Sequence, residues 1–407
     1  MPFDIDANTV FIGLTGSHAH GTARPSSDVD LRGCCVAPLA QRLSFRAQFE
    51  QRTWVGEGEP PAQDLGPNFA RALARVGLHP SAGPALADDP APDLVIFDLA
   101  KVLSLCALSN PNMFEMLFLD EREIVFTTPL WEQLRGQRHL FLSQQVRHTY
   151  AGYAKGQLRR IRGHREWLLN PPSHPPTRAE FGLPEQSVLS ADDRNRIEEA
   201  ITKQLRAWSV DEGIELPSAE RDVLRARMEE FWTATLEAAN APHSAPLSPP
   251  TSAPPDQSLE QGMAAVAGAR LGLSREVLEI LGNERRYRSA RRHWDQFCRW
   301  QRERNSKRAA LEAAHGYDTK HGAHLIRLLR MGVEILRDGQ VKVRREDAEE
   351  LRAIRDGALT YAALIEQAEA LELDMRRAVS ATSLPPKVDE ARLDALLFEL
   401  LQRHGKD

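Results

Sequence analysis

Two aspartates separated by one apolar residue, Asp28 and Asp30, could carry out metal-dependent chemistry. Alternate residues of a strand point to the same face, so a strand over Asp28–Leu31 would project both carboxylates together. Carboxylate oxygens are the ligands that hard cations such as Mg²⁺, and also Mn²⁺, prefer. Two such cations can activate an attacking hydroxyl and stabilise the leaving oxygen of an in-line displacement at phosphorus. The pair therefore indicates phosphoryl-group chemistry.

The pair Gly16 and Ser17 could hold the phosphates for such a reaction. A glycine lets the backbone approach a phosphate closely, and Ser17 can donate both its hydroxyl and its backbone N–H, especially where a helix starts. Residues 18–22 could open that helix before Pro25 ends it. Each short pattern alone is usually a solvated turn. Their order, Gly-Ser after the apolar run Val10–Leu14 and then Asp-x-Asp, favours the functional interpretation.

These residues must be positioned by a sheet with flanking helices. The pattern predicts strand, loop and strand over 8–37, a helix near Asn68–Val76 within a Pro- and Gly-rich stretch, and a further strand and helix within 94–118. Residues 131–167 are predicted to be largely helical, ending before Pro171. The fold class predicted is α+β, with strands concentrated in the N-terminal part.

We predict two regions along the chain. Residues 1–130 would form the domain with the carboxylates, and 131–407 a helical region. Within the latter, 171–310 would be an insertion that contains a Pro/Ser/Ala linker at 241–257, and 311–407 would be its helical C-terminal part.

Composition restricts the function classes. The chain has 407 residues and a net charge of −5, so it is not a generally basic polyanion binder, and any contact with RNA must be local. Four scattered cysteines without a C-x-x-C pair argue against a disulfide framework and structural zinc, and suit the cytoplasm. The N-terminus lacks a signal-peptide pattern, and no apolar run is long enough to span a membrane. The oligomeric state is left open.

The carboxylate motif is followed by further blocks that recur in one known family. The blocks are residues 16–33, 93–101 with 109–118, 150–160, and 317–329 trailed by Arg355–Gly357. The first is typical of the DNA polymerase β superfamily of nucleotidyltransferases. Together the blocks resemble the RNA-repair-pathway DNA polymerase β family. The resemblance implies a polymerase β-like mixed sheet, bound Mg²⁺ or Mn²⁺, an NTP substrate and a role at RNA ends.

Sites of this type use a third carboxylate from a later strand, and the segment Asp93–Asp98 offers two. Asp93 would share a face with Val95 and Phe97, whereas Asp98 stands where the N-cap of the following helix is expected. Asp93 is therefore preferred as the third ligand, with Asp98 in reserve.

Cationic side chains are expected to bind the nucleotide. Tyr317, Lys320, His324 and Arg327 recur at helical spacing and would suit a triphosphate or an RNA backbone, although a solvated helix face gives the same pattern. The spacing of His321 and His324 also permits a metal site, which is disfavoured because no carboxylate or cysteine partner is identified nearby.

The residues next to the Asp and Gly-Ser motifs have more than one interpretation. Arg32 could pair with an aspartate or neutralise a phosphate. His18 and His20 favour local packing or a nucleotide contact over metal ligation. Glu115 could be a buried partner of a nearby Lys or Arg.

Two basic helices could contact RNA. One carries Lys155 and Arg159–Arg165, and the other runs over Arg285–Arg308 with Tyr287, Trp294 and Phe297 along it. Aromatic residues at that spacing are more often core than base-stacking platforms, and charged helix faces are often only solvated.

The leading hypothesis is transfer of an NMP to a hydroxyl acceptor, with an RNA (tRNA-like) 3′ end favoured. In it Asp28 and Asp30 bind the metals, Asp93 aligns the acceptor, and Gly16 and Ser17 hold the triphosphate. A small molecule or a protein is the alternative acceptor. A non-catalytic RNA-binding scaffold is the third hypothesis, but it has no need for clustered carboxylates that repel one another.

Overall fold

The computed structural model describes residues 3–24, 27–45, 48–54, 66–75, 93–187, 199, 275–304 and 306–404. The strands are β1 Thr9–Leu14, β2 Asp30–Cys35, β3 Gln51–Trp54, β4 Asp93–Asp98 and β5 Ile124–Thr127. The helices up to residue 187 are α1 Gly16–Ala19, α2 Leu39–Arg42, α3 Pro67–Arg75, α4 Leu99–Ala107, α5 Pro111–Phe114, η2 Glu115–Phe118, α6 Pro129–Gly136, η3 Arg138–Phe141, α7 Gln145–Leu169 and η4 Ala179–Phe181. The later ones are α11 Arg275–Glu303, α12 Ser306–His315, α13 Thr319–Asp338, α14 Ala348–Arg355, α15 Tyr361–Ala381 and α16 Glu390–His404.

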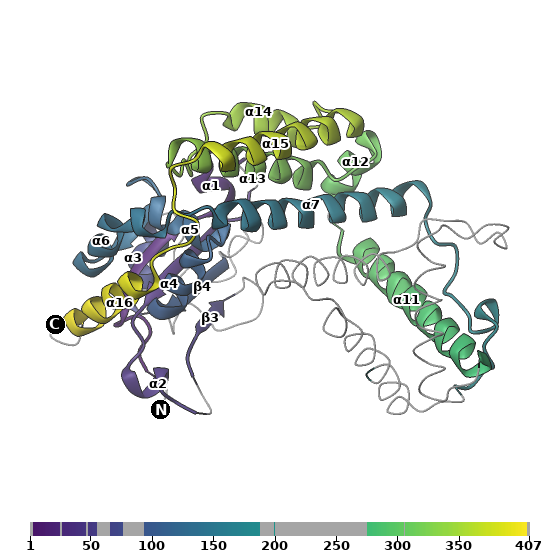
Figure 1. Ribbon diagram of the computed structural model, residues 1–407, viewed down its shortest axis with the longest axis horizontal. Coiled ribbons are helices and arrows are strands. Elements are labelled where there is room, and N and C mark those ends of the chain that lie inside the picture. Colours follow the sequence, from purple (N-terminus) through teal and green to yellow (C-terminus); the bar gives the residue numbers. More distant parts are fainter. Residues whose placement is uncertain are drawn as a thin grey trace, which may run out of the picture. The chain divides into compact units, whose positions relative to one another are not determined.

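The five strands form one mixed sheet in the order β3-β4-β2-β1-β5. Only β2 and β4 run parallel, while the other neighbouring pairs are antiparallel. The chain between these parallel strands includes β3 and α3, as a crossover connection requires. Strands at the N-terminal end followed mostly by helices confirm the predicted α+β class (Figure 1).

Successive residues of each strand point to opposite sides of the sheet. Both faces are covered by hydrophobic clusters. On one side Leu94 and Ile96 of β4 pack with Phe69 of α3. On the other, Phe97 belongs to the larger core with the residues of α4, α6, α7 and α13. The ring of Trp131 stacks on Phe11 at 4.1 Å between centroids in this larger core. The predicted helix near Asn68–Val76 is confirmed as α3.

Two predicted boundaries are wrong by a few residues. The strand expected over Asp28–Leu31 begins only at Asp30, where the ladder with β4 starts, so Asp28 lies in the preceding loop. The helix expected over 18–22 is instead α1, which spans Gly16–Ala19. It ends early because Gly21, with φ 73°, adopts a left-handed conformation that a right-handed helix cannot include.

The C-terminal helices α13, α14 and α15 lie together (Figure 1). Asp318 caps α13 by accepting the backbone N–H of His321 at 3.1 Å. A Cβ on Gly332 of α13 would lie 2.5 Å from Cε of Met375 on α15, so glycine permits this close packing. None of the helices in the described ranges is long and apolar enough to cross a membrane.

Contacts divide the chain into two compact units, which are 1–164 with 310–407, and 165–309. The second unit is close in extent to the predicted insertion 171–310. The proposed domain boundaries themselves stay a prediction. The linker predicted at 241–257 lies outside the described residues.

Within the second unit, aromatic residues of α11 pack against one another and against two residues outside this helix. Phe297 packs against Trp167, Trp294 and Trp300, with ring centroids 5.9–6.0 Å apart. Tyr287 contacts Phe181 at 5.8 Å. Phe297 is buried, which confirms the core interpretation for this residue. Tyr287 and Trp294 are half-buried, and for them the interpretation stays a prediction.

Candidate active site

Asp30 and Asp93 stand side by side where two neighbouring interior strands of the sheet begin. They are register partners in the parallel ladder of β2 and β4, and each is the first residue of its strand. The backbone N–H of Asp93 donates to the carbonyl of Val29 at 3.1 Å, which fixes this register. Direct partners in a ladder project to the same face. The structure thus brings together two of the three carboxylates that the sequence singled out.

The carboxyl of Asp30 lies in an environment that resists a negative charge. Its pKa is raised, first by burial and then by the charges of Asp93 and Asp28, while Arg32 and Lys320 act in the opposite direction. Asp28, although exposed and outside the strand, is therefore close enough to act on Asp30. Three carboxylates that repel one another gain most from a bound cation.

The three aspartates form an open arrangement. Asp28 and Asp93 are exposed and Asp30 is half-buried, so all three can be reached by a substrate. The ligand atoms of these three aspartates do not all lie within 4.8 Å of one another. Among the described residues, only the separate trio His164, Asp318 and His321 meets that distance. All-carboxylate donors with mutual repulsion suit Mg²⁺ or Mn²⁺, so the residues present fit the implied metals.

Gly16 places the Gly-Ser turn directly against Asp30. Its φ of 61° is left-handed, and a Cβ there would lie 2.4 Å from Oδ2 of Asp30. The backbone N–H of Thr15 donates to the carbonyl of Asp30 at 2.9 Å, which holds the turn to β2. Ser17 follows in α1, a single turn with a half-buried serine. A phosphate beside this turn would thus meet Ser17 and the carboxylates together.

Asp98, the reserve for the third carboxylate, has a structural role. It is 4% exposed and caps α4 by accepting the N–H of Ala100 at 3.0 Å. It also accepts the N–H of Ala37 and pairs with Arg42, both at 3.0 Å. Because Asp98 lies five residues after Asp93 in one strand, it points to the opposite face. The geometry favours Asp93 as the third carboxylate.

Arg32 occupies the same face of β2 as Asp30, two residues on. Its guanidinium donates to the carbonyl of Asn112 at 2.7 Å. Asn110 caps the short helix α5 and Pro111 begins it, which presents that carbonyl. Burial lowers the pKa of Arg32, and the carboxylates of Glu115 and Asp30 oppose this shift. Arg32 therefore contacts a backbone carbonyl and lies close to Asp30.

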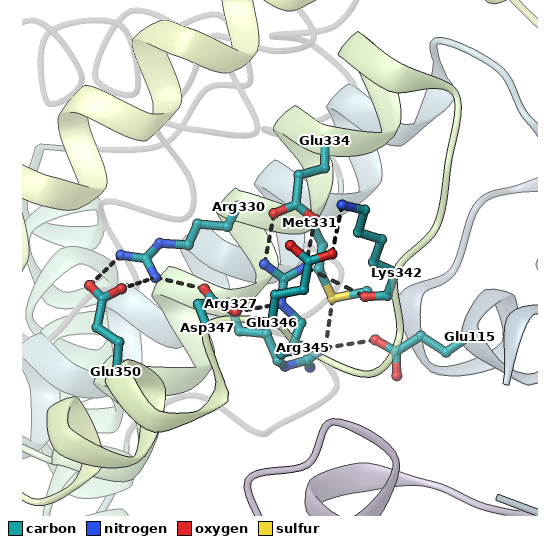
Figure 2. Close-up of polar contacts among 10 residues, drawn as sticks. All are labelled: Glu115, Arg327, Arg330, Met331, Glu334, Lys342, Arg345, Glu346, Asp347 and Glu350. Atoms are coloured by element: carbon teal, nitrogen blue, oxygen red, sulfur yellow. Dashed lines mark hydrogen bonds and ion pairs between the residues drawn. The ribbon is translucent and has the colours of Figure 1, made fainter. Parts of the chain in front are cut away.

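A buried ionic cluster lies behind this surface. Glu115 accepts from Arg327 at 2.7 Å, which Figure 2 shows, and from His20 at 2.8 Å. The pKa of Glu115 is lowered by His20 and Arg327, which overcome the opposing effect of burial. Glu115 is thus the buried carboxylate that the sequence suggested as a partner for a cation near the site.

Arg327 and His324, both predicted to bind nucleotide, belong to this cluster. The guanidinium of Arg327 lies 3.0 Å from Nε2 of His324. It also contacts the sulfur of Met331 (Figure 2). Since arginine only donates, Nε2 of His324 must accept, which requires a neutral imidazole. Burial and the charge of Arg327 lower the pKa of His324 to about 2. Both side chains therefore have protein partners, and their contact with a nucleotide stays a prediction.

Lys320 differs from these two residues. It is exposed, and its charge acts on Asp30 from the first turn of α13. Among the three cations predicted on this helix, Lys320 is the one whose position suits a triphosphate held by the carboxylates. Arg330, one turn beyond Arg327, instead pairs with Asp347 at 2.6 Å and with Glu350 (Figure 2).

A pocket of about 260 Å³ adjoins the Gly-Ser turn. Its lining includes His18 and Val29, the sequence neighbours of Ser17 and of the two aspartates, together with Arg75 and Arg122. The two arginines were not singled out from the sequence. They lie far along the chain from the motif, so no local pattern could have found them.

Comparison with known proteins gives one match. Residues 4–169 match the model of the RNA repair pathway DNA polymerase beta family, which confirms the resemblance for the motif blocks within this segment, while the block at 317–357 lies outside the match. No curated protein and no solved structure matches the chain significantly. The matched segment contains the whole sheet, Asp28, Asp30, Asp93 and the Gly-Ser turn.

Proposed function

Given the match of residues 4–169 to this family, we propose that the protein transfers an NMP from an NTP to a hydroxyl acceptor, an RNA 3′ end above all. The observation that carries the proposal is the placement of Asp30 and Asp93 as register partners, with Gly16 in contact distance of Asp30. A polymerase β-like nucleotidyltransferase needs this combination of carboxylates and a phosphate-holding turn.

Each residue then has a distinct task. Asp28 and Asp30 hold Mg²⁺ or Mn²⁺, and Asp93 completes the carboxylate set and aligns the acceptor hydroxyl. The metal ions, when bound, neutralise phosphate charge and increase the acidity of the acceptor. Ser17 donates to a phosphate oxygen, and Gly16 lets the backbone come close enough. Lys320 offsets the charge of the triphosphate, as it already offsets that of Asp30.

The second unit offers a basic surface that would suit an RNA acceptor. Helix α11 exposes several arginines, while its aromatic residues pack together around the buried Phe297. Arg285, Arg292 and Arg299 are exposed and seven residues apart, so they lie along one stripe of the helix. Such a stripe suits a phosphate backbone, and this local basic surface is compatible with a chain of net charge −5.

RNA binding tests the acceptor separately from the chemistry. We expect the triple variant Arg285→Gln, Arg292→Gln, Arg299→Gln to bind a single-stranded RNA more weakly. The salt dependence of binding should fall by about 0.7 in logarithmic slope for each RNA phosphate that the variant no longer neutralises. A matched variant at Arg377 on α15, also exposed, should keep the original slope. Unchanged RNA binding in the triple variant would favour a small-molecule or protein acceptor.

The same assay, run with NTP and Mg²⁺, addresses the scaffold alternative. A protein that binds RNA but incorporates no nucleotide under any metal would be a non-catalytic scaffold. The raised pKa of Asp30 argues against this, because a scaffold gains nothing from carboxylates that repel one another. We also propose a cytoplasmic location, which suits the unpaired cysteines at Cys34, Cys35, Cys106 and Cys298.

A further inference from the structure

Two histidines and an aspartate lie close together at a place separate from Asp28, Asp30 and Asp93. His164 lies near the end of α7, Asp318 caps α13, and His321 stands in the first turn of α13. One ligand atom from each lies within 4.8 Å of the others, and among the described residues no other such group of His, Cys, Asp and Glu is found. The expectation that His321 has no carboxylate partner nearby is therefore wrong, because Asp318 is that partner.

The distances suit ligands around an ion better than direct hydrogen bonds. Oδ2 of Asp318 lies 3.5 Å from Nδ1 of His164 and 3.5 Å from Nε2 of His321. Hydrogen bonds of this kind are usually shorter, about 2.7–3.2 Å. Bonds of about 2.0–2.1 Å to a tetrahedral zinc ion place neighbouring ligand atoms about 3.3–3.4 Å apart. The observed separations are close to such an edge.

The surroundings hold the ligands in place. The side chain of Asp318 is fully buried, and its Oδ1 accepts the N–H of His321 at 3.1 Å, which directs Oδ2 towards the two imidazoles. His164 and His321 keep 19% and 16% of their side-chain surface exposed, so an ion can enter. Thr319, between Asp318 and His321, donates to the carbonyl of Arg355 at 2.7 Å and fixes this first turn.

We propose that His164, Asp318 and His321 bind a first-row divalent transition-metal ion, with Zn²⁺ as the best fit. Two imidazole nitrogens and one carboxylate oxygen suit zinc, whereas an all-oxygen set suits Mg²⁺. The fourth position is open to water. The ion joins the end of α7 to the start of α13, and so fixes the turn that carries Lys320, the neighbour of His321. This site is distinct from Asp28, Asp30 and Asp93.

Metal analysis of the full chain tests the site without depending on turnover. The protein is treated with a chelator, returned to buffer with Zn²⁺ or Co²⁺, and freed of excess metal. We expect one equivalent of Zn²⁺, a higher unfolding temperature with zinc, and the visible absorption of tetrahedral Co²⁺. His164→Ala and His321→Ala should each weaken zinc binding at least tenfold and lose the temperature shift.

Two further variants guard against misreading a folding defect. Asp318→Asn keeps a side-chain acceptor for the helix cap, so it should fold normally, as far-UV circular dichroism can verify, and still lose zinc affinity. His148→Ala removes an exposed histidine from the same helix as His164 and should bind zinc like the original protein. Absence of stoichiometric binding, or equal binding by all four variants, would overturn the proposal whether or not the protein transfers nucleotides.

Discussion

Asp30 and Asp93 lie side by side as direct partners in the parallel ladder between β2 and β4, and each is the first residue of its strand. This relationship places two carboxylates together at the N-terminal ends of β2 and β4, next to the Gly16–Ser17 turn. Asp98, in the same strand as Asp93, points to the other face of the sheet and caps α4. Asp93 is therefore placed to act on substrate, whereas Asp98 stabilises the fold.

Replacing Asp93 and replacing Asp98 should have opposite consequences. Asp93→Asn removes an exposed charge that repels Asp30, so stability should change by no more than about 0.5 kcal/mol while nucleotide transfer falls about a hundredfold or more. Asp98→Ala removes a helix cap and leaves Arg42 without its buried partner, at a cost of about 3 kcal/mol or more. Urea unfolding and turnover, measured on both variants, check the assignment. A stable, fully active Asp93→Asn would refute it.

Gly16→Ala should damage the site more than the fold. The added Cβ meets Oδ2 of Asp30 and the left-handed backbone disfavours alanine, so we expect a loss of stability of about 1–2 kcal/mol and a large loss of transfer activity. Gly152→Ala is the matched control, because a Cβ there has open space in α7 and alanine favours a helix. Equal activity of both variants would contradict a role for Gly16 at the site.

The protein should lose stability as the pH falls below about 6.5. Burial holds the pKa of His324 near 2 and also lowers that of His20, so the unfolded chain takes up protons that the folded state does not. Stability is then lost by about 1.4 kcal/mol per pH unit for each such group. The contribution of Glu115, whose folded pKa is depressed, is lost only below its unfolded pKa of about 4.5.

Urea unfolding at about pH 7.5 and about pH 5.5 measures this effect, since the window lies above the titration of unfolded Glu115. His324→Gln offers a neutral acceptor to Arg327 and does not titrate, so it should reduce the difference between the two pH values. An identical pH dependence in that variant would show that His324 is not held neutral.

Lys320 should set the affinity for the nucleotide. Lys320→Met removes an exposed cation that acts on Asp30, and we expect the KM for NTP to rise about tenfold to a hundredfold, the range for the removal of a charge-assisted hydrogen bond. Lys342→Met is the control, because the amine of Lys342 is held by Glu346 at 3.0 Å. Steady-state kinetics on both variants decide whether Lys320 contacts the triphosphate.

Local signals in the sequence predicted the parts of the fold that depend on neighbours along the chain. Asp98 was recognised as a helix cap because its position before an apolar run is sufficient. The start of β2 was placed two residues early, since where a ladder begins depends on the partner strand. The contacts of Glu115 with Arg327 and His20 join residues far apart in sequence, which no periodicity reveals.

Incorporation of α-labelled ATP, CTP, GTP and UTP into a pool of cellular RNA, with Mg²⁺ or Mn²⁺, tests the central claim most directly. We predict label in RNA from the original protein and from Asp374→Ala, which removes an exposed aspartate of α15, and none from Asp28→Ala or Asp30→Ala. Label that persists at full level in the Asp28→Ala and Asp30→Ala variants, or that never appears in RNA with any nucleotide and metal, would contradict the account.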